Sequence, residues 1–267
     1  MALSGEIPFI WIVRGWAGRS QAEGGGGRFD PPAAGLYPAR VNETEFSARL
    51  EFLPWILGML VITSCVHEAG HAWTAWRMGD QRPYIRTRSN PASWRHISLI
   101  FTIILPSALM LMGAPLLGGA KPVMVRTAIG PRRMALVALA GPMGNILVGV
   151  LSIGVLAGLL HARVLTPSWQ WDRYYVFALY AVALNFILAL LNLLPLPPFD
   201  GSRIVAMFLP EKIRNIYYKL TIPVLIAFIV LILFSDRLFD DALGRFTLAV
   251  LHIVHDAVLS VQHWIEL

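Results

Sequence analysis

The stretch HEAGH at positions 67–71 lies within an apolar run that extends from about Phe52 to Trp76. Ionisable side chains are costly at bilayer depth, so a cluster of them there indicates a functional site rather than packing. Residues four positions apart share one face of a helix, and His67 and His71 can therefore bind the same metal ion. Glu68 flanks that face and can hold a water molecule without binding the metal itself. The stretch predicts a transmembrane helix that carries a zinc-hydrolase site.

The composition is that of a membrane protein. Of the 267 residues, 56% are hydrophobic and 14% are charged, whereas soluble domains have about 25% charged residues. The net charge of +6 comes from Lys and Arg that fall mainly in short segments between apolar runs, which is the positive-inside pattern. We therefore expect contact with a lipid bilayer and no binding of nucleic acid. The single cysteine, Cys65, excludes an internal disulfide and a cysteine-based zinc site.

Four apolar runs are long enough to cross about 30 Å of hydrocarbon as helices. They extend from Phe52 to Trp76, from Met134 to Leu160, from Tyr174 to Leu194 and from about Ile216 to Phe234. Together with the less regular apolar regions, they predict an all-α polytopic membrane protein with about four to six transmembrane helices.

A broken apolar segment lies between the first two runs, at about residues 97–123. Pro106, Gly113 and Pro115 interrupt it, and basic residues flank both of its ends. Basic flanks favour the cytosol, and a single crossing cannot place both ends on the same side of a membrane. We therefore predict a re-entrant or hairpin segment, whose irregular backbone is tolerated where protein or water shields it. The same charge pattern places the HEAGH stretch toward the cytosolic end of its helix.

The two ends of the chain differ from its centre. Residues 1–50 contain a Gly-rich stretch and several prolines, and they predict a flexible N-terminal extension. Residues 236–267 predict a C-terminal amphipathic or transmembrane helix. A polar stripe recurs there at helical spacing and consists of His252, His255, Asp256 and His263. We interpret this stripe as a hydrated face rather than a metal site.

Asp200 is the best candidate for a third metal ligand. Zinc hydrolases bind their ion through three protein side chains and leave a fourth position for water, so a third ligand must come from elsewhere in the chain, and cysteine cannot supply it. Asp200 ends the stretch NLLPLPPFDG, whose prolines stop the preceding helix and whose final residue, Gly201, permits an irregular turn. The alternative is that Asp200 caps the helix that follows. Without the HEAGH stretch, the cap is the interpretation that the residues favour.

Two asparagines share one face of the third apolar run, because Asn185 and Asn192 are seven residues apart. For Asn185 we expect a hydrogen bond to another helix. Asn192 lies close to Asp200 in the sequence, and we expect it to bind the carbonyl or oxyanion of a substrate.

Three blocks of sequence resemble the site-2 protease family, the intramembrane zinc metalloproteases, in the short bacterial form that lacks a PDZ domain. The first block is HEAGH at 67–71, the second is GGAKPV at 118–123 with AGPMGN at 140–145, and the third is NLLPLPPFDG at 192–201. The resemblance runs from about residue 54 to residue 205, and the order and spacing of the blocks make it specific.

The resemblance implies a site and a function. By it, the zinc ligands are His67, His71 and Asp200, the catalytic residue is Glu68, and the substrate-binding residues are Asn192 and Asn145. Residues 51–235 then form an intramembrane metalloprotease domain in a bacterial cell membrane, with the active site toward the cytosol. The implied substrate is a transmembrane protein or peptide, such as an anti-sigma factor or a signal-peptide remnant, cut within or near a transmembrane helix.

Two departures from the family pattern lie in the broken segment. Gly119 stands where the family usually has Trp, and Ser98-Leu99 stands where it has Asp-Pro. They concern the hairpin and its substrate contacts rather than the metal site.

Two other functions are compatible with the residues. An intramembrane metal or proton transporter also uses buried His and Asp, although two half-repeats with broken helices are not evident here. A catalytically inactive adaptor of the same fold is the second alternative. Cleavage that a chelator blocks would separate the three.

Overall fold

The computed structural model describes residues 43–112, 118–167, 173–234 and 244–266. All regular elements in these ranges are helical, so the prediction of an all-α chain is confirmed. The longer helices are α2 (Glu43–Arg77), α4 (Leu105–Met112), α5 (Pro131–His161), α6 (Arg173–Asn192), α8 (Glu211–Lys219), α9 (Thr221–Phe234) and α10 (Gly244–Glu266). The shorter ones are α3 (Pro83–Arg88), η1 (Trp94–His96), η2 (Leu99–Ile104), η3 (Thr127–Ile129) and α7 (Gly201–Ala206).

Two of these helices are long and apolar enough to cross a membrane, namely residues Arg49–Arg77 of α2 and the whole of α5. Two shorter apolar helices cover Leu99–Met112 and Phe177–Asn192. The predicted extension, residues 1–50, falls mainly outside the described residues, and its last part, 43–50, forms the first turns of α2.

The predicted fourth span, Ile216–Phe234, is wrong at its start. The structure ends α8 at Lys219 and begins α9 at Thr221, with Leu220 between them. Pro223 explains the break, because proline has no N–H to donate and its ring clashes with the carbonyl four residues earlier, that of Lys219. The amide of Val224 donates to the carbonyl of Leu220 at 2.9 Å, and the new helix starts from there.

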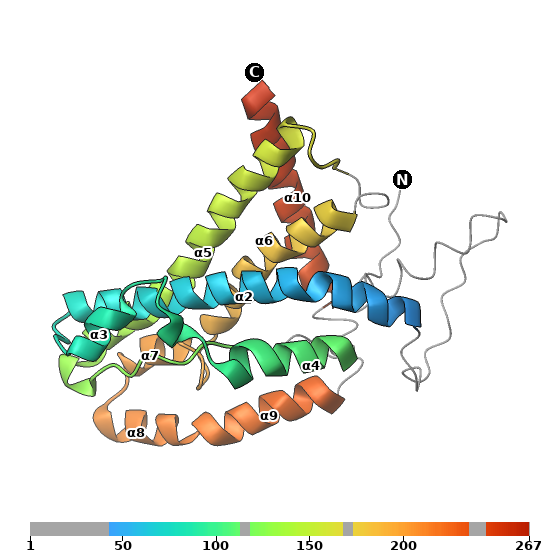
Figure 1. Cartoon of the computed structure of the whole chain (residues 1–267). Coiled ribbons are helices and arrows are strands. Elements are labelled where there is room, and N and C mark those ends of the chain that lie inside the picture. Colours follow the sequence, from blue (N-terminus) through green and yellow to red (C-terminus); the bar gives the residue numbers. More distant parts are fainter. Residues whose placement is uncertain (1–42, 113–117, 168–172, 235–243, 267) are drawn as a thin grey trace.

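Helix α2 crosses the middle of the molecule, with α5, α6 and α10 on one side of it and α4 on the other (Figure 1). The α5–α6–α10 group encloses one core, to which Leu156, Leu179 and Leu251 each contribute a buried side chain. Helices α2 and α5 approach so closely that a Cβ atom on Gly70 would lie 2.7 Å from the carbonyl oxygen of Ala140. Small residues at such contacts are typical of helix pairs in membranes.

A buried hydrogen bond joins α2 to α6, since the hydroxyl of Thr63 donates to the side-chain oxygen of Asn185 at 2.9 Å. This confirms the interhelical bond that the sequence predicts for Asn185. It also orients the face of α2 that carries the HEAGH stretch, one helical turn further along.

The broken segment at 97–123 folds back on itself. The amide of Lys121 donates to the carbonyl of His96, and the amide of Gly119 donates to the carbonyl of Phe101, both at 2.9 Å. Both ends of the segment therefore lie side by side, as a hairpin requires. Ser98, one of the departures from the family pattern, accepts a hydrogen bond from the amide of Phe101 at the start of η2.

Helix α10 is amphipathic in the way the sequence predicts. Its apolar face, which includes Leu251 and Val258, is buried against α5 and α6, whereas His252 and Asp256 are exposed. The rest of the predicted C-terminal segment, residues 236–243 and 267, lies outside the described residues.

Candidate metal centre

His67 and His71 project from the same face of α2, one turn apart. Their Nε2 atoms are 3.0 Å apart and their rings are nearly perpendicular, with an interplanar angle of 89°. Perpendicular rings direct two lone pairs to a common point rather than stacking one imidazole on the other. The helix thus presents two convergent nitrogen atoms that could bind one ion, a geometry that the spacing of the two histidines predicts.

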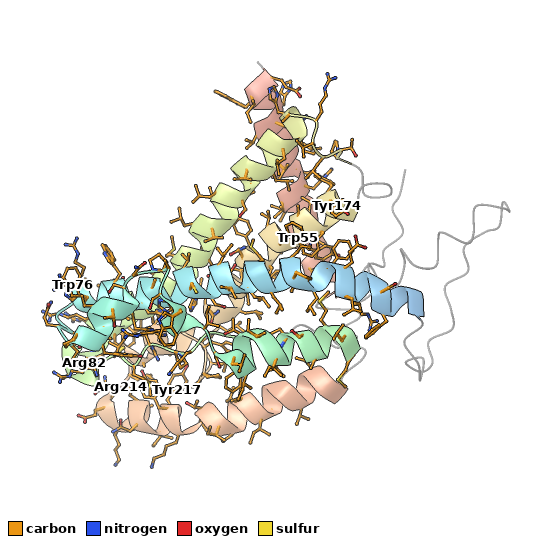
Figure 2. The ribbon with its side chains drawn as sticks, viewed as in Figure 1. Trp55, Trp76, Arg82, Tyr174, Arg214 and Tyr217 are labelled. Atoms are coloured by element: carbon orange, nitrogen blue, oxygen red, sulfur yellow. The ribbon has the colours of Figure 1, made fainter. Side chains whose placement is uncertain are left out.

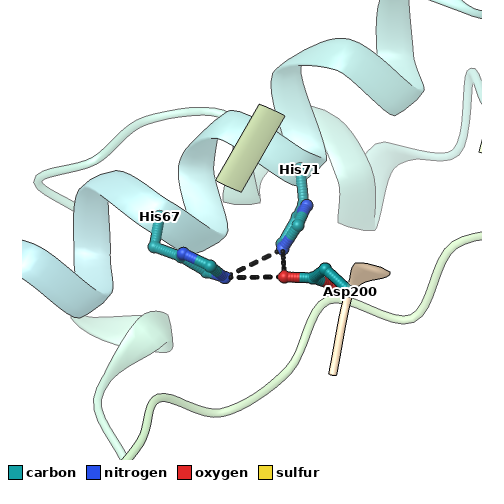
Figure 3. Close-up of side chains that lie close together, drawn as sticks. All are labelled: His67, His71 and Asp200. Atoms are coloured by element: carbon teal, nitrogen blue, oxygen red, sulfur yellow. Dashed lines mark hydrogen bonds and ion pairs between the residues drawn. The ribbon is translucent and has the colours of Figure 1, made fainter. Parts of the chain in front are cut away.

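Asp200 reaches the same point from a distant part of the chain (Figure 3). Its Oδ2 atom lies 3.1 Å from the Nε2 atoms of both His67 and His71. Asp200 occupies the N-cap position of α7, but its side chain makes no capping hydrogen bond. The carboxylate is turned to the histidines instead, which favours the ligand interpretation over the cap.

The separations fit a small tetrahedral ion. Bonds of about 2.0–2.1 Å to a tetrahedral zinc place the ligand atoms about 3.3 Å from one another. The three atoms of this site are 3.0–3.1 Å apart, so shifts of a few tenths of an ångström would complete the geometry. Two imidazoles and one carboxylate also form a donor set that catalytic zinc uses, and it leaves a fourth position open.

The backbone of α5 fixes the orientation of one ligand. The Nδ1 atom of His71 lies 2.7 Å from the carbonyl oxygen of Val137, so Nδ1 carries the proton and donates it there. Nε2 is then the unprotonated atom with a lone pair for a metal, and outer hydrogen bonds of this kind are usual for zinc-bound histidines. The Nδ1 atom of His67 is buried and has no partner among the described residues.

Gly141 on α5 lies directly against the two imidazoles. A Cβ atom at this position would be 2.5 Å from Cε1 of His71 and 2.7 Å from Nε2 of His67, both far inside van der Waals contact. In the sequence, Gly141 stands out only as part of the AGPMGN block at 140–145. In the structure Gly141 packs against the Nε2 side of the two imidazole rings. Any side chain at this position would displace the rings.

Glu68 lies beside the triad and does not join it. Its Oε2 atom accepts a hydrogen bond from the amide of Val123 at 2.8 Å, and 8% of the residue is exposed. Its Oε1 atom has no hydrogen bond among the described residues. Val123 belongs to the returning strand of the hairpin, and the sequence gives no sign of this contact because it involves a backbone amide.

Among the described residues, the two predicted substrate-binding asparagines make no hydrogen bond to the triad. The side-chain amide of Asn192 donates to the carbonyl of Leu188 in its own helix at 2.9 Å. Asn145 is 1% exposed, and its Oδ1 atom has no partner among the described residues. It follows Gly141 by one helical turn and so lies on the same face of α5.

Comparison with known proteins agrees with this arrangement. A family model described as Peptidase family M50 matches residues 155–234, which include Asp200. The Bacillus subtilis (strain 168) protein named "Putative zinc metalloprotease YwhC" is 30% identical over 220 residues, which cover 79% of this chain and 92% of the relative. The chain belongs to peptidase family M50. Membership confirms the predicted resemblance to site-2 proteases and the predicted class of enzyme, a metalloprotease.

Two further relatives match over a smaller part of their length. The proteins named "Putative zinc metalloprotease Rip2" from Mycolicibacterium smegmatis and Mycobacterium tuberculosis (strain H37Rv) are 32% and 31% identical over 157 and 150 residues, which cover 56% of this chain and 55% of each relative. No solved structure matches the chain significantly. Zinc, the cofactor expected from the sequence, is confirmed at the level of the family, and the described residues contain one group of side chains able to hold it.

Proposed function

We propose that the protein is an intramembrane zinc metalloprotease that hydrolyses a peptide bond within or near a transmembrane helix of a membrane-protein substrate. The observation that carries the proposal is the convergence of His67, His71 and Asp200 on the side of α2, a helix long enough to cross a membrane. A hydrolytic centre within a membrane-spanning helix is poorly placed to reach a soluble substrate. Membership of a peptidase family supports hydrolysis over ion transport.

In this proposal His67, His71 and Asp200 hold the zinc ion. When bound, zinc lowers the pKa of water to about 7 and polarises an amide carbonyl. The chain's own contribution is to fix the ligands: Val137 sets the tautomer of His71, and Gly141 leaves the space in which the three side chains meet. All three ligand side chains are at most 12% exposed, so water has limited access to them.

Glu68 acts as general base and then as general acid. Its two oxygens have different surroundings, because Oε2 is held by the amide of Val123 and Oε1 is not. We assign the proton to Oε1, which takes it from the attacking water and delivers it to the leaving amine. The fixed Oε2 keeps the carboxylate from rotating between the two transfers.

The extended segment 118–126 offers an edge for an unwound substrate. The amides of Gly119, Lys121 and Val123 all donate to groups within the protein. Alternate residues of an extended strand face opposite edges, so Ala120, Pro122 and Met124 face the other way. Pro122 has no N–H and the amide of Met124 donates to the Tyr84 hydroxyl at 3.5 Å, which leaves the amide of Ala120 for a substrate strand. Asn192 and Asn145 would bind the substrate carbonyl or oxyanion beside this strand.

We further propose that the site lies toward the cytosolic side of a bacterial cell membrane. Arg82 and Arg214 lie at the same end of the molecule as Trp76, which is near the C-terminus of α2 (Figure 2). Basic residues gather on the cytosolic side, and the HEAGH stretch is near this end. We count α6 and α9 as spans beside α2 and α5 and treat the hairpin as re-entrant. The chain would then have at least four spans, within the predicted range of four to six.

The test is cleavage of a model single-pass substrate by the purified protein in detergent. The proposal expects cleavage that EDTA abolishes and zinc restores, and Glu68→Gln should retain zinc while losing cleavage. Glu51→Gln, at the other end of α2, is the matched control. Zinc binding by the wild type without any cleavage would instead indicate the inactive adaptor. Zinc flux into sealed vesicles without cleavage would indicate the transporter.

A further inference from the structure

Arg88 is among the most deeply buried polar side chains of the protein, at 1% exposure, although it belongs to a short surface helix, α3. Arginine is rarely buried to this extent unless its charge is paired. Its Nε atom has no hydrogen-bond partner among the described residues. Complete hydrogen bonding of the guanidinium therefore does not explain why the side chain is buried. A buried cation with an incomplete set of bonds needs another reason to be there.

The guanidinium closes the neck of the hairpin. Nη1 of Arg88 donates to the carbonyl of Arg95 at 2.5 Å, and Nη2 donates to the carbonyl of Lys121. The first carbonyl belongs to η1, just before the segment at 97–123, and the second belongs to the returning end of that segment. One planar side chain therefore joins the two ends, and its fork geometry makes this possible.

The same nitrogen also faces the catalytic carboxylate. Nη2 of Arg88 lies 3.9 Å from Oε2 of Glu68, which is an electrostatic contact rather than a hydrogen bond. That Oε2 atom is the one held by the amide of Val123, two residues after Lys121. Arg88 thus acts on Glu68 twice, directly through charge and indirectly through the strand that carries Val123.

We propose that Arg88 is a positioning residue that holds Glu68 and the substrate-facing strand in one fixed relation. The inference rests on the proposed function, since it gives Glu68 the role of base. The mechanism above does not need Arg88 to touch substrate, zinc or water. It needs Arg88 to hold the segment whose Val123 amide occupies Oε2, so that Oε1 alone faces the reaction.

The kinetic test compares Arg88→Gln with Arg88→Lys, each normalised to bound zinc. Removing the charge should lower kcat per zinc by roughly 10- to 100-fold, as expected when a catalytic group shifts by about 1 Å. Arg88→Lys keeps the charge but reaches fewer carbonyls, so its kcat should fall between Arg88→Gln and wild type. Arg86→Gln changes an exposed arginine of the same helix and should match wild type.

Hydrogen exchange gives a second readout that does not depend on activity. In Arg88→Gln the amides of Lys121 and Val123 should exchange faster, while those of α6 should not change. An unchanged kcat per zinc in Arg88→Gln would overturn the inference, and so would an equal loss in both variants that tracks zinc loss. If the wild type cleaves no substrate, the proposed function fails. Separately, unchanged hydrogen exchange at Lys121 and Val123 in Arg88→Gln would show that Arg88 does not hold this segment.

Discussion

On α2, His67 and His71 lie four residues apart, and on α10, His252 and His255 lie three apart. Both spacings place two imidazoles on one helical face. Around the first pair, a carboxylate arrives from α7 and a glycine of α5 leaves room for an ion. Around the second pair, His252 is exposed and Nδ1 of His255 lies 2.5 Å from the hydroxyl of Tyr175.

The comparison teaches that spacing selects a face and that the neighbouring elements decide its use. Helix α10 meets α6 through a tyrosine hydroxyl, which satisfies one imidazole and offers no third ligand. Helix α2 meets α5 through a backbone carbonyl and a glycine, so that both Nε2 atoms remain directed at one point. A histidine pair becomes a metal centre when the elements around it leave a shared position open.

The largest effect expected from this comparison is the loss of Asp200. Asp200→Ala should lower zinc affinity by more than roughly 100-fold, because even an outer-shell partner is worth 10- to 100-fold, and cleavage should disappear with the metal. His255→Ala should leave both unchanged. Metal analysis of the two purified variants after dialysis checks this, and full zinc content in Asp200→Ala would return Asp200 to the role of a helix cap.

A smaller effect is expected from one methyl group on α5. Gly141→Ala would force a Cβ against both imidazoles, and we expect zinc affinity to fall while the helix itself is retained. Gly154→Ala lies on the same helix with open space around its Cβ, and it should stabilise the protein by roughly 0.5–1 kcal/mol through helix propensity. Zinc titration and thermal unfolding of both variants check these expectations. Zinc affinity equal to that of the wild type in Gly141→Ala would contradict the role given to this glycine.

The smallest effect concerns a second buried carboxylate, which has a partner of its own. The hydrogen bonds from the Arg82 side chain, and then the one from the Arg126 amide, lower the pKa of Asp80 to about 2. A lowered pKa contributes stability that is present above the unfolded value of about 4 and is lost as the pH falls toward 2.

We therefore expect the Asp80 contribution to be constant at pH 5–8 and to decline only in acid, in about the range between its two pKa values. Asp80→Asn should flatten that acid decline without changing zinc content. Thermal unfolding of wild type and variant from pH 6 downward, with metal analysis at pH 7, checks both parts. A loss of zinc in Asp80→Asn would mean that the carboxylate of Asp80 influences the metal centre at Asp200.

The sequence predicts the parts of this site that depend on local periodicity. The face of α2 follows from the spacing of His67 and His71, and the hairpin follows from basic flanks around a broken apolar run. Asp200 could be selected because cysteine was excluded and because prolines stop the helix before it. Apart from the cysteine count, each of these signals lies within a limited stretch of the chain.

The remaining features depend on contacts between distant segments and leave little trace in the sequence. Val137 and Val123 act through backbone atoms, which any residue would supply. Arg88 lies among several arginines that look equally exposed in the sequence, and only the fold buries it. The break before α9 has a visible cause in Pro223, which lies inside the apolar run at Ile216–Phe234.

The most direct test of the central claim is the position of zinc in an anomalous-scattering map of the zinc-loaded protein. The account predicts one peak per chain, at about 2.0–2.2 Å from Nε2 of His67, Nε2 of His71 and Oδ2 of Asp200. A peak bound by the α10 histidines, or one with Asp200 turned away from it, would contradict the account.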